Sequence, residues 1–411
     1  MKKIFFGLAA TLLSNFIFGQ KACRSFDYQN QLIQNDPSIA VSQKAIESFV
    51  NSHLLSSART LQPKIITIPV IVHILYHYPG ENISDDLVRS QITALNRDYR
   101  KLNADTVKIP AVFKSLAADC GIQFQLATSD PHGGATTGII HKYTPITKWT
   151  ADDQIKFSSK MGDDAWDAKS YLNIWVGTLP TVLGYSSLPG DPADKDGVVI
   201  SSAAFGILSG GPYDKGRTAV HEIGHWLGLK HLWGDAYCGD DGVADTPKQA
   251  TFTNGCPNGI RTSCDNSPNG DMYMDYMDFT DDDCLVMFTE GQKQKMLTLF
   301  EPGGARNSIL VSHGLSIPTI EEAPLPDNSP QWLHVKIYPN PANNELTINV
   351  EFDTRWVGKE LTITNVIGQV EIKKTISSKV QQLDISKLTP GIYFISAKKD
   401  GDTILEKFVK L

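Results

Sequence analysis

Hydrophobic and polar residues change their spacing along the chain, and these changes predict the order of its elements. Residues 65–76 (IITIPVIVHILY) are rich in β-branched side chains, which indicates a buried strand. Ser84 can cap a helix whose apolar residues recur at helical spacing as far as Tyr99. Before a later helix that contains His221, further strands are expected at residues 121–126, 171–177 and 197–201. This order predicts an α/β unit in which a twisted sheet backs one functional helix.

The pattern changes again in the second half of the chain. From about residue 240 to residue 271, Gly, Asn, Asp and Pro are abundant and predict loops, and a helix is expected at 289–300. Residues 316–332 contain four prolines and predict a linker. Short alternating strands with a "KKDG" turn follow, so residues 333–411 are predicted to form a small all-β sandwich domain.

The N-terminus has the features of an export signal. Lys2 and Lys3 precede a mostly apolar run from Ile4 to Phe18, which predicts a signal peptide over residues 1–20. No later stretch approaches 18 consecutive apolar residues, so no membrane span is expected in the mature protein.

Export places the six cysteines in an oxidising compartment. Four of them lie between residues 238 and 284, and sequence alone allows three pairings of four cysteines.

The charge balance argues against one class of partner. The net charge is −7 and the pI is near 5.8. A nucleic-acid-binding protein needs a basic face, and this acidic balance argues against one. Acidic residues gather at 235–245 and 275–283. These clusters favour bound cations or basic substrates, and a solvated acidic loop is the alternative.

The segment "HEIGHWLGLKH" carries the candidate chemistry. On a helix, His221 and His225 lie on one face and can bind one metal ion together. Glu222 can reach a metal-bound water without binding the metal itself. Gly228 can end the helix, and His231 can then return to the metal. Three histidines and one water form an open, catalytic zinc site.

The alternative is a core helix with hydrogen-bonded histidines, because a bare HExxH often occurs by chance. The extended HExxHxxGxxH pattern in an exported chain favours zinc and resembles the metzincin proteases. "DGVADTP" (241–247) and "DMYMDYMDFTDDDCLVMFTEGQ" (271–292) resemble the pappalysin family, in particular its ulilysin- and mirolysin-like members. The resemblance covers about residues 60–300. It implies a metzincin zinc protease domain over 59–315, with a twisted mixed sheet, an active-site helix and a loop-rich C-terminal subdomain.

The resemblance also implies roles for single residues. Glu222 is the general base and then the general acid, and Met277 is the methionine of the Met-turn beneath the zinc histidines. Without the upstream motif, Met277 would be interpreted as a core methionine. The family usually has a tyrosine two residues later, whose hydroxyl stabilises the tetrahedral intermediate. This chain has Phe279 there, which has no hydroxyl to donate.

In the resemblance, Cys238 pairs with Cys264 and Cys256 with Cys284, which leaves Cys120 as a small buried thiol.

Two more sites follow from the same resemblance. Asp282 is expected at the base of the pocket for the residue after the scissile bond, where it selects arginine or lysine. An exposed acidic loop is the alternative for Asp282. Structural calcium is expected near "DDGVADTP", whose carboxylate and carbonyl oxygens suit a hard cation. The candidate calcium ligands are Asp241, Val243, Asp245 and Thr246.

Residues 21–58 are predicted to be a removable pro-segment. Cys23 lies just after the predicted signal, and a thiolate there can occupy the fourth zinc position as a latency switch. Related proenzymes use a cysteine of this kind. Cleavage near Ala58–Arg59 would then release the enzyme. The alternative is that Cys23 is unpaired or paired with Cys120.

The C-terminal sequences "VKIYPNPANNELTINV", "NVIGQV" and "LTPGIYFISAKKDG" resemble the type A sorting domain of type IX secretion. This resemblance implies the type IX secretion machinery as a partner and the surface or medium of a Gram-negative bacterium as the destination. An adhesive sandwich is the alternative.

Together these patterns predict a secreted zinc endopeptidase that acts on protein or peptide substrates. The alternative from another class is a non-catalytic cell-surface binding protein that keeps zinc as a scaffold. A non-proteolytic zinc hydrolase is a third, weaker interpretation.

Overall fold

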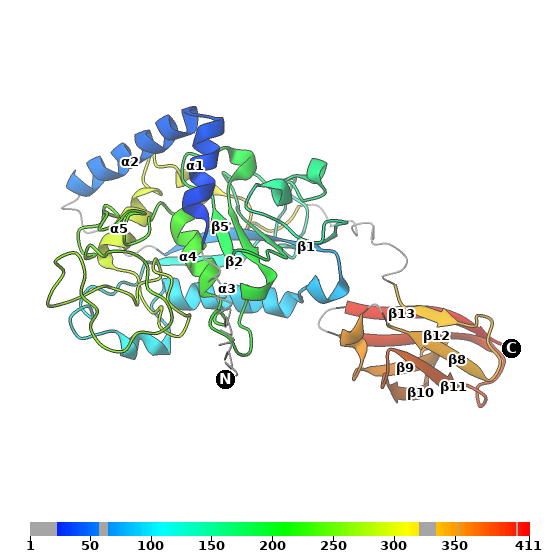
Figure 1. Cartoon of the computed structure of the whole chain (residues 1–411). Coiled ribbons are helices and arrows are strands. Elements are labelled where there is room, and N and C mark those ends of the chain that lie inside the picture. The colour runs from blue at the N-terminus through cyan, green and yellow to red at the C-terminus, as the bar shows by residue number, and fades with distance from the viewer. Residues whose placement is uncertain (1–22, 57–64, 320–333, 352, 400–401) are drawn as a thin grey trace, which may run out of the picture.

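A computed structural model describes residues 23–56, 65–319, 334–351, 353–399 and 402–411 (Figure 1). Within these described ranges, the N-terminal part contains five α-helices and six strands, and the C-terminal part contains seven strands. The α-helices are α1 Ser25–Asn35, α2 Ser38–Ser56, α3 Asp85–Tyr99, α4 Arg217–Trp226 and α5 Glu290–Thr298. The strands of the N-terminal part are β1 Ile66–Tyr76, β2 Ile122–Leu126, β3 Ile139–Tyr143, β4 Leu172–Gly177, β5 Gly184–Ser186 and β6 Val198–Ser201.

Short 3-10 helices connect these elements: η1 Pro79–Glu81, η2 Ala104–Lys108, η3 Gln154–Lys156, η4 Ser158–Lys160, η5 Ala193–Lys195, η6 Ser202–Ala204 and η7 Asn307–Val311. The segment between α4 and α5 has no α-helix or strand. This observation confirms the loop-rich subdomain expected there.

The central sheet has the strand order β2-β1-β4-β6-β5, and β3 also pairs with β1. β1 is long enough to pair with β2 through Ile66–Val70 and with β3 through Val72–Tyr76, in both cases in parallel. β4 and β6 continue the parallel arrangement, whereas β5 is antiparallel to β6 and forms one edge. The predicted mixed sheet is therefore confirmed.

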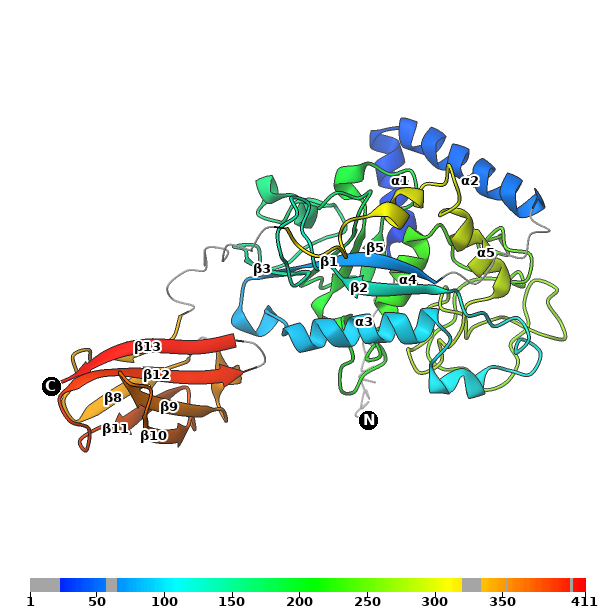
Figure 2. The ribbon, with the colours of Figure 1, turned by 180° about the vertical axis from the view of Figure 1, so that it is seen from behind.

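Side chains on the two faces of this sheet enter separate cores, because successive residues of a strand point to opposite faces. Ile174 and Val176 of β4 belong to the main core with Val220 and Ile223 of α4. Trp175, between them, belongs to a second core on the other face. The main core lies beneath α3 and α4, and Figure 2 shows α3 running alongside β2. The helix that carries His221 is therefore backed by the sheet.

The second core includes residues of the predicted pro-segment. Tyr28 and Leu32 of α1, and Ile39 of α2, pack there with aromatic side chains of the sheet. Both views place α1 and α2 on the side of the sheet away from α3 (Figures 1 and 2). The pro-segment thus docks onto the protease instead of forming a core of its own.

Local signals in the sequence define the ends of two helices. Ser84 caps α3 by accepting a hydrogen bond from the Leu87 amide. α5 begins with a capping box, in which Thr289 and Gln292 satisfy each other's backbone amides. Among the described residues, no helix is long and apolar enough to cross a membrane.

The C-terminal part is an all-β sandwich, as predicted. Its antiparallel sheets have the orders β10-β9-β12-β13 and β11-β8-β7, and they enclose a separate apolar core. The strands are β7 Lys336–Tyr338, β8 Glu345–Asn349, β9 Glu360–Asn365, β10 Val370–Thr375, β11 Val380–Asp384, β12 Gly391–Lys399 and β13 Asp402–Lys410, with η9 at Thr354–Trp356. The predicted signal peptide, the cleavage site and most of the linker lie outside the described residues. The predicted domain boundaries therefore stay predictions.

Candidate active site

Three histidines converge at the C-terminal half of α4. Their Nε2 atoms are 3.1 Å apart between His221 and His225, 3.3 Å between His221 and His231, and 3.1 Å between His225 and His231. His221 and His225 occupy one face of α4, one turn apart. Gly228, with φ of +83°, ends the helical path so that His231 turns back towards them.

The second nitrogen of each ring holds that ring in place. The Nδ1 atom of His221 donates to the Tyr276 carbonyl (2.7 Å), and that of His225 donates to the Leu229 carbonyl (2.9 Å). The Nδ1 atom of His231 bonds to the Asp235 carboxylate (2.5 Å). Each Nε2 atom therefore presents a lone pair to the common centre. Burial lowers the pKa of His221, and burial and His231 lower the pKa of His225 to about 3, so both rings are neutral.

Cys23 joins the three histidines from the pro-segment. Its Sγ atom lies 3.6 Å from Nε2 of His225, and the four candidate ligand atoms lie within 4.8 Å of one another. Three imidazole nitrogens and one thiolate suit tetrahedral zinc. The donor set therefore fits the metal that the sequence predicts.

Glu222 is buried beside this cluster and is already engaged by the pro-segment. Its Oε2 atom accepts a hydrogen bond from Ser25 Oγ (2.9 Å) and contacts Cys23 Sγ at 3.5 Å. Its Oε1 atom has no hydrogen-bond partner in the part of the chain that the structure describes. Burial raises the pKa of Glu222 to about 7.

Met277 lies against α4 beneath the histidines. A methyl group added at Gly224 would stand 2.5 Å from Met277 Sδ, so the methionine and the helix backbone are in close contact. The Met277 amide donates to Asp275 Oδ1 (2.8 Å), which holds the turn. The position matches the Met-turn expected at this residue.

Comparisons with known proteins agree with this geometry. Residues 156–301 match the family described as Pregnancy-associated plasma protein-A, and residues 336–411 match the Secretion system C-terminal sorting domain. An extracellular metalloprotease of Pyricularia oryzae is 30% identical over 318 residues, which cover 73% of this chain and 96% of that relative. This chain belongs to the pappalysin family of metzincin metalloproteases.

Solved structures of mirolysin have the same fold as this pappalysin. Mature mirolysin of Tannerella forsythia in complex with a cleaved peptide is 42% identical, with a TM-score of 0.60, over 62% of this chain and 99% of that one. A mutant of T. forsythia promirolysin is 39% identical, with a TM-score of 0.66, over 71% and 97% of the two chains. The pappalysin described here is a zinc metalloendopeptidase, and its sorting domain makes it a secreted or cell-surface protein.

Phe279 of this pappalysin sits against the histidine cluster. Its ring centroid is 4.9 Å from that of His231 and 5.0 Å from that of Trp233, which itself stacks on His231 at 4.4 Å. Tyr276, three residues before Phe279, packs between Arg217 and Phe288. Aromatic contacts therefore support the metal ligands here, and Phe279 adds no hydrogen-bond donor.

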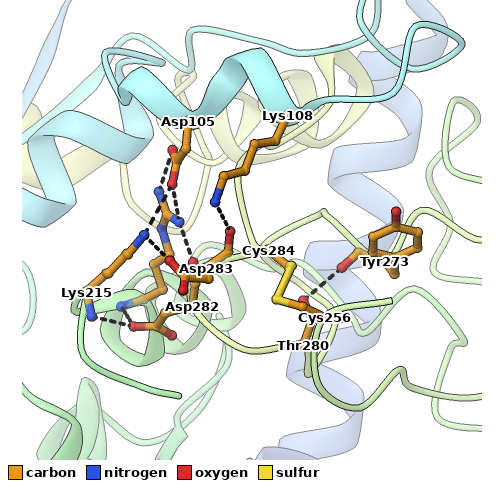
Figure 3. The surroundings of a disulfide bond; sticks show 10 residues. Asp105, Lys108, Lys215, Cys256, Tyr273, Thr280, Asp282, Asp283 and Cys284 are labelled. Atoms are coloured by element: carbon orange, nitrogen blue, oxygen red, sulfur yellow. Dashed lines mark hydrogen bonds and ion pairs between the residues drawn. A yellow bond between two sulfur atoms is a disulfide. The ribbon is translucent and has the colours of Figure 1, made fainter. Parts of the chain in front are cut away.

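Asp282 lies in the wall of a small cavity that extends from the histidines. The cavity measures about 40 Å³, and Cys23, Glu222, Phe279 and Tyr213 also line it. Oδ2 of Asp282 accepts hydrogen bonds from the amides of Lys215 (2.8 Å) and Arg217 (3.2 Å) (Figure 3). Burial raises the pKa of Asp282 to about 6. The alternative of an exposed loop is wrong, because this side chain is buried.

The buried Arg217 does not neutralise the Asp282 carboxylate directly. Its guanidinium pairs with Asp98 (3.1 Å) and Asp105 (2.8 Å), and it bonds to the backbone carbonyl of Asp282. No salt bridge to the Asp282 carboxylate occurs among the described residues. The hydrogen bonds of this carboxylate are therefore those from the two backbone amides, among the residues that the structure describes.

The two predicted disulfide pairs are present. Cys238 is bonded to Cys264, and Cys256 is bonded to Cys284, which is the pairing that the resemblance implies. Figure 3 shows the second disulfide next to Asp282 and Asp283, where Lys108 Nζ donates to the Asp283 carbonyl (2.9 Å). Cys120 is a free, buried thiol, and Cys23 is free as well.

The carboxylates among the candidate calcium ligands accept local hydrogen bonds. The Asp241 carboxylate accepts from Thr246 Oγ1 at 2.8 Å and from the Val243 amide at 3.0 Å. Asp245 accepts from Thr289 Oγ1 (2.8 Å) and from the Gly291 amide (2.9 Å), at the start of α5. The two carboxylates thus order this loop, and calcium binding by it stays a prediction.

Sequence reasoning missed several residues that shape the site. Ser25 binds the general-base candidate, Asp235 orients His231, and Gly224 makes room for Met277. Asp235 lies four residues after His231, a spacing that could have suggested the pair. Nothing in the sequence near Ser25 indicates a contact with a residue 197 positions away.

Proposed function

We propose that His221, His225 and His231 hold the catalytic zinc of this endopeptidase and that Glu222 is its general base. The observation that supports this proposal is the convergence of three Nε2 atoms at 3.1–3.3 Å beside a buried carboxylate. Zinc in such a site polarises a substrate carbonyl and lowers the pKa of a water molecule towards neutrality. Glu222 takes the proton of the attacking water and gives it to the leaving amine.

The substitution Glu222→Ala tests this mechanism in the processed enzyme. We expect zinc content to stay at one ion per chain, because Glu222 is not a ligand, while kcat falls by at least about 1,000-fold. Metal analysis and hydrolysis of a peptide library measure the two quantities separately. Normal turnover by this variant would contradict the assignment of Glu222 as the general base. Loss of zinc would show instead that Glu222 has a structural role.

We further propose that Asp282 selects arginine or lysine immediately after the scissile bond. Its buried carboxylate faces a cavity with no competing salt bridge among the described residues, so a basic side chain can pair with it. Mapping of the cut sites in a peptide library, with and without a zinc chelator, tests this preference. Cleavage without enrichment of basic residues at that position would contradict it.

The pro-segment is proposed to keep the precursor latent through two contacts. Cys23 occupies the fourth ligand position, and Ser25 hydrogen-bonds to Glu222. Both contacts must break before a substrate can reach the centre.

We also propose that the sandwich domain binds the type IX secretion machinery, in line with the sorting-domain match over residues 336–411. Structural calcium in the loop around Asp241 and Asp245 is part of the same proposal.

A further inference from the structure

The pro-segment makes a second anchoring contact on the face of the sheet opposite the zinc site. Tyr28, on α1, is 2% exposed and packs in the second core. Its ring centroid is 4.9 Å from that of Tyr185 on β5. Trp175 of β4 is part of the same core. Residues of α1 thus enter an aromatic pocket that the protease itself provides.

This pocket also contains a buried ion pair that Tyr28 completes. The Tyr28 hydroxyl donates to Asp153 Oδ2 (2.9 Å), and Lys156 Nζ pairs with Asp153 Oδ1 (2.9 Å). Lys156 is 0% exposed, and its Nζ lies 5.1 Å from the ring centroids of Tyr28 and Tyr185 and 5.5 Å from that of Trp175. We name these four protease residues, Asp153, Lys156, Trp175 and Tyr185, the tyrosine socket.

The pro-segment reaches both the zinc site and the tyrosine socket by passing along the edge strand β5. The Arg24 amide donates to the Gly184 carbonyl (3.2 Å), and the Ser186 amide donates to Ser25 Oγ (2.9 Å). Gly184 faces α4, since a methyl group added there would meet Glu222, whereas Tyr185 belongs to the opposite core. The pro-segment therefore contacts β5 from both faces, with Cys23 on one side and Tyr28 on the other.

The chemistry of the socket favours a phenol over other side chains. An aromatic ring can lie over the Lys156 ammonium, and its hydroxyl can donate to the Asp153 carboxylate. A phenylalanine would keep the ring contacts and lose the hydrogen bond. A lysine or arginine would place a second cation beside Lys156. The backbone of Asp153 has φ of +66°, a costly conformation for a residue other than glycine, so the surrounding contacts must hold it.

We propose that the socket is a binding site for tyrosine side chains that is separate from the zinc centre. In the precursor it holds Tyr28, and after processing it is emptied and binds the released pro-segment again in trans. The inference rests on the proposed removal of the pro-segment, but it does not depend on zinc ligation by Cys23. The activated enzyme would therefore be inhibited by its own pro-segment until that peptide is diluted or degraded.

A binding experiment on the processed enzyme tests the proposal. The probe is a fluorescent peptide of residues 23–50 that carries Cys23→Ser, so that its thiol cannot bind zinc. We expect Tyr28→Ala to weaken binding by at least about 30-fold, as for truncation of a buried aromatic anchor. Tyr28→Phe should weaken it by about 10-fold through loss of the hydrogen bonds of the Tyr28 hydroxyl with Asp153 and Lys156. Fluorescence anisotropy gives the Kd values, and mass spectrometry checks that the peptides stay intact.

Phe26 provides the matched control, because it is an aromatic residue of the same helix that is 47% exposed. Phe26→Ala should change Kd by less than about twofold. Alanine favours helix formation more than tyrosine does, so weaker helix formation cannot explain a loss in the Tyr28→Ala peptide. Equal losses for the two alanine peptides, or no binding of the unsubstituted probe, would overturn the proposal. Neither result would affect the test of Glu222.

The full-length precursor gives an independent readout that does not require processing. Hydrogen exchange of the α1 amides should be about 30-fold faster in Tyr28→Ala than in Phe26→Ala, because the first variant releases the helix from the protease. In an Asp153→Ala precursor, the difference between Tyr28 and Tyr28→Phe should become smaller, because only the weaker hydrogen bond from Lys156 to the hydroxyl is left. Identical exchange in the two alanine variants would contradict an anchor at Tyr28, even if the processed enzyme were inactive.

Discussion

At the scale of single residues, Phe279 and Asp282 offer different chemistry to a substrate in the cavity beside Glu222. Both line the cavity that opens from the histidines, one with an apolar ring and the other with a buried carboxylate. Phe279 supports His231 by ring contact but has no hydroxyl to stabilise an oxyanion. Two backbone amides hold the Asp282 carboxylate in place. We therefore expect Phe279 to affect the rate and Asp282 to affect the specificity.

Phe279→Tyr should raise kcat, because it adds a hydroxyl at the position where the family resemblance leads us to expect one. One added donor to the developing oxyanion is worth on the order of 10- to 100-fold. Steady-state kinetics on the processed enzyme measure kcat and KM separately, and KM should change little. Phe252→Tyr is the control, since Phe252 belongs to the same aromatic cluster at 5.3 Å from Phe279. An unchanged kcat would show that this enzyme stabilises the intermediate by other groups.

The preference for basic residues should depend on pH through Asp282. Burial raises its pKa to about 6, Arg217 lowers it and Asp214 raises it. Below this pH the carboxyl group is neutral and loses its attraction for arginine or lysine; above it the carboxylate is charged. The ratio of kcat/KM for arginine over norleucine at the selected position should therefore fall as pH drops from 7 to 5.

Asp282→Asn should give a low ratio at every pH, while Asp281→Asn should keep the wild-type profile. A ratio that does not change with pH in the wild-type enzyme would count against the Asp282 pocket.

At the scale of elements, α4 and the Met-turn must fit each other closely for the histidines to meet. Gly224 packs so closely on Met277 that there is no room for a side chain at this position. Gly228 has a positive φ, which ends the helix and lets the chain bring His231 back towards the other histidines. Tyr276 of the turn accepts the hydrogen bond of His221. The histidine cluster is therefore held together by the contact between these two elements.

Gly224→Ala should destabilise the protein although alanine is the better helix former. The gain in helix propensity is about 1 kcal/mol, but the new methyl group would stand 2.5 Å from Met277 Sδ. Overpacking of this kind costs about 1–3 kcal/mol, so the net change should be a lower Tm and weaker zinc retention. Thermal unfolding and metal analysis measure both effects.

Gly80→Ala is the matched control for this substitution, because no atom lies within 4 Å of the added methyl group. If both variants unfolded at the wild-type temperature and kept zinc, the close contact would have no energetic role.

At the scale of the whole molecule, the pro-segment is built into the protease from two sides. Cys23 and Ser25 reach the metal centre, and Tyr28 reaches the core on the other face of the sheet. Among the described residues, the sandwich domain has its own core and supplies no candidate ligand to the histidine cluster. Latency and delivery are therefore predicted to depend on opposite ends of the chain.

Cys23→Ala should activate the intact precursor only in part. Removing the thiol frees the fourth ligand position, but Ser25 still bonds to Glu222 and Tyr28 still anchors α1. We expect activity about 10-fold above that of the uncleaved wild-type precursor and below that of the processed enzyme. Mass spectrometry must confirm that the chain is uncut. Activity as low as that of the wild-type precursor would refute the role of the thiol.

Much of this protein follows from its sequence, where the signal is local. The period of apolar residues predicts β1 and α3, and the spacing of His221, His225 and His231 predicts the metal ligands, because helix geometry relates spacing directly to direction. The loop-rich subdomain and the all-β domain follow from turn residues and alternation in the same way. The two disulfide pairings came from family resemblance, since spacing alone left three arrangements open.

Only the tertiary structure decided which distant residues meet. Ser25 and Glu222 are 197 positions apart, and Tyr28 and Asp153 are 125 apart, so no local pattern could connect them. The burial of Lys156 depends on strands β4 and β5 and on a helix from the pro-segment all packing together. Local spacing determines the direction of a side chain on its own element, whereas contacts between elements depend on how the whole chain packs.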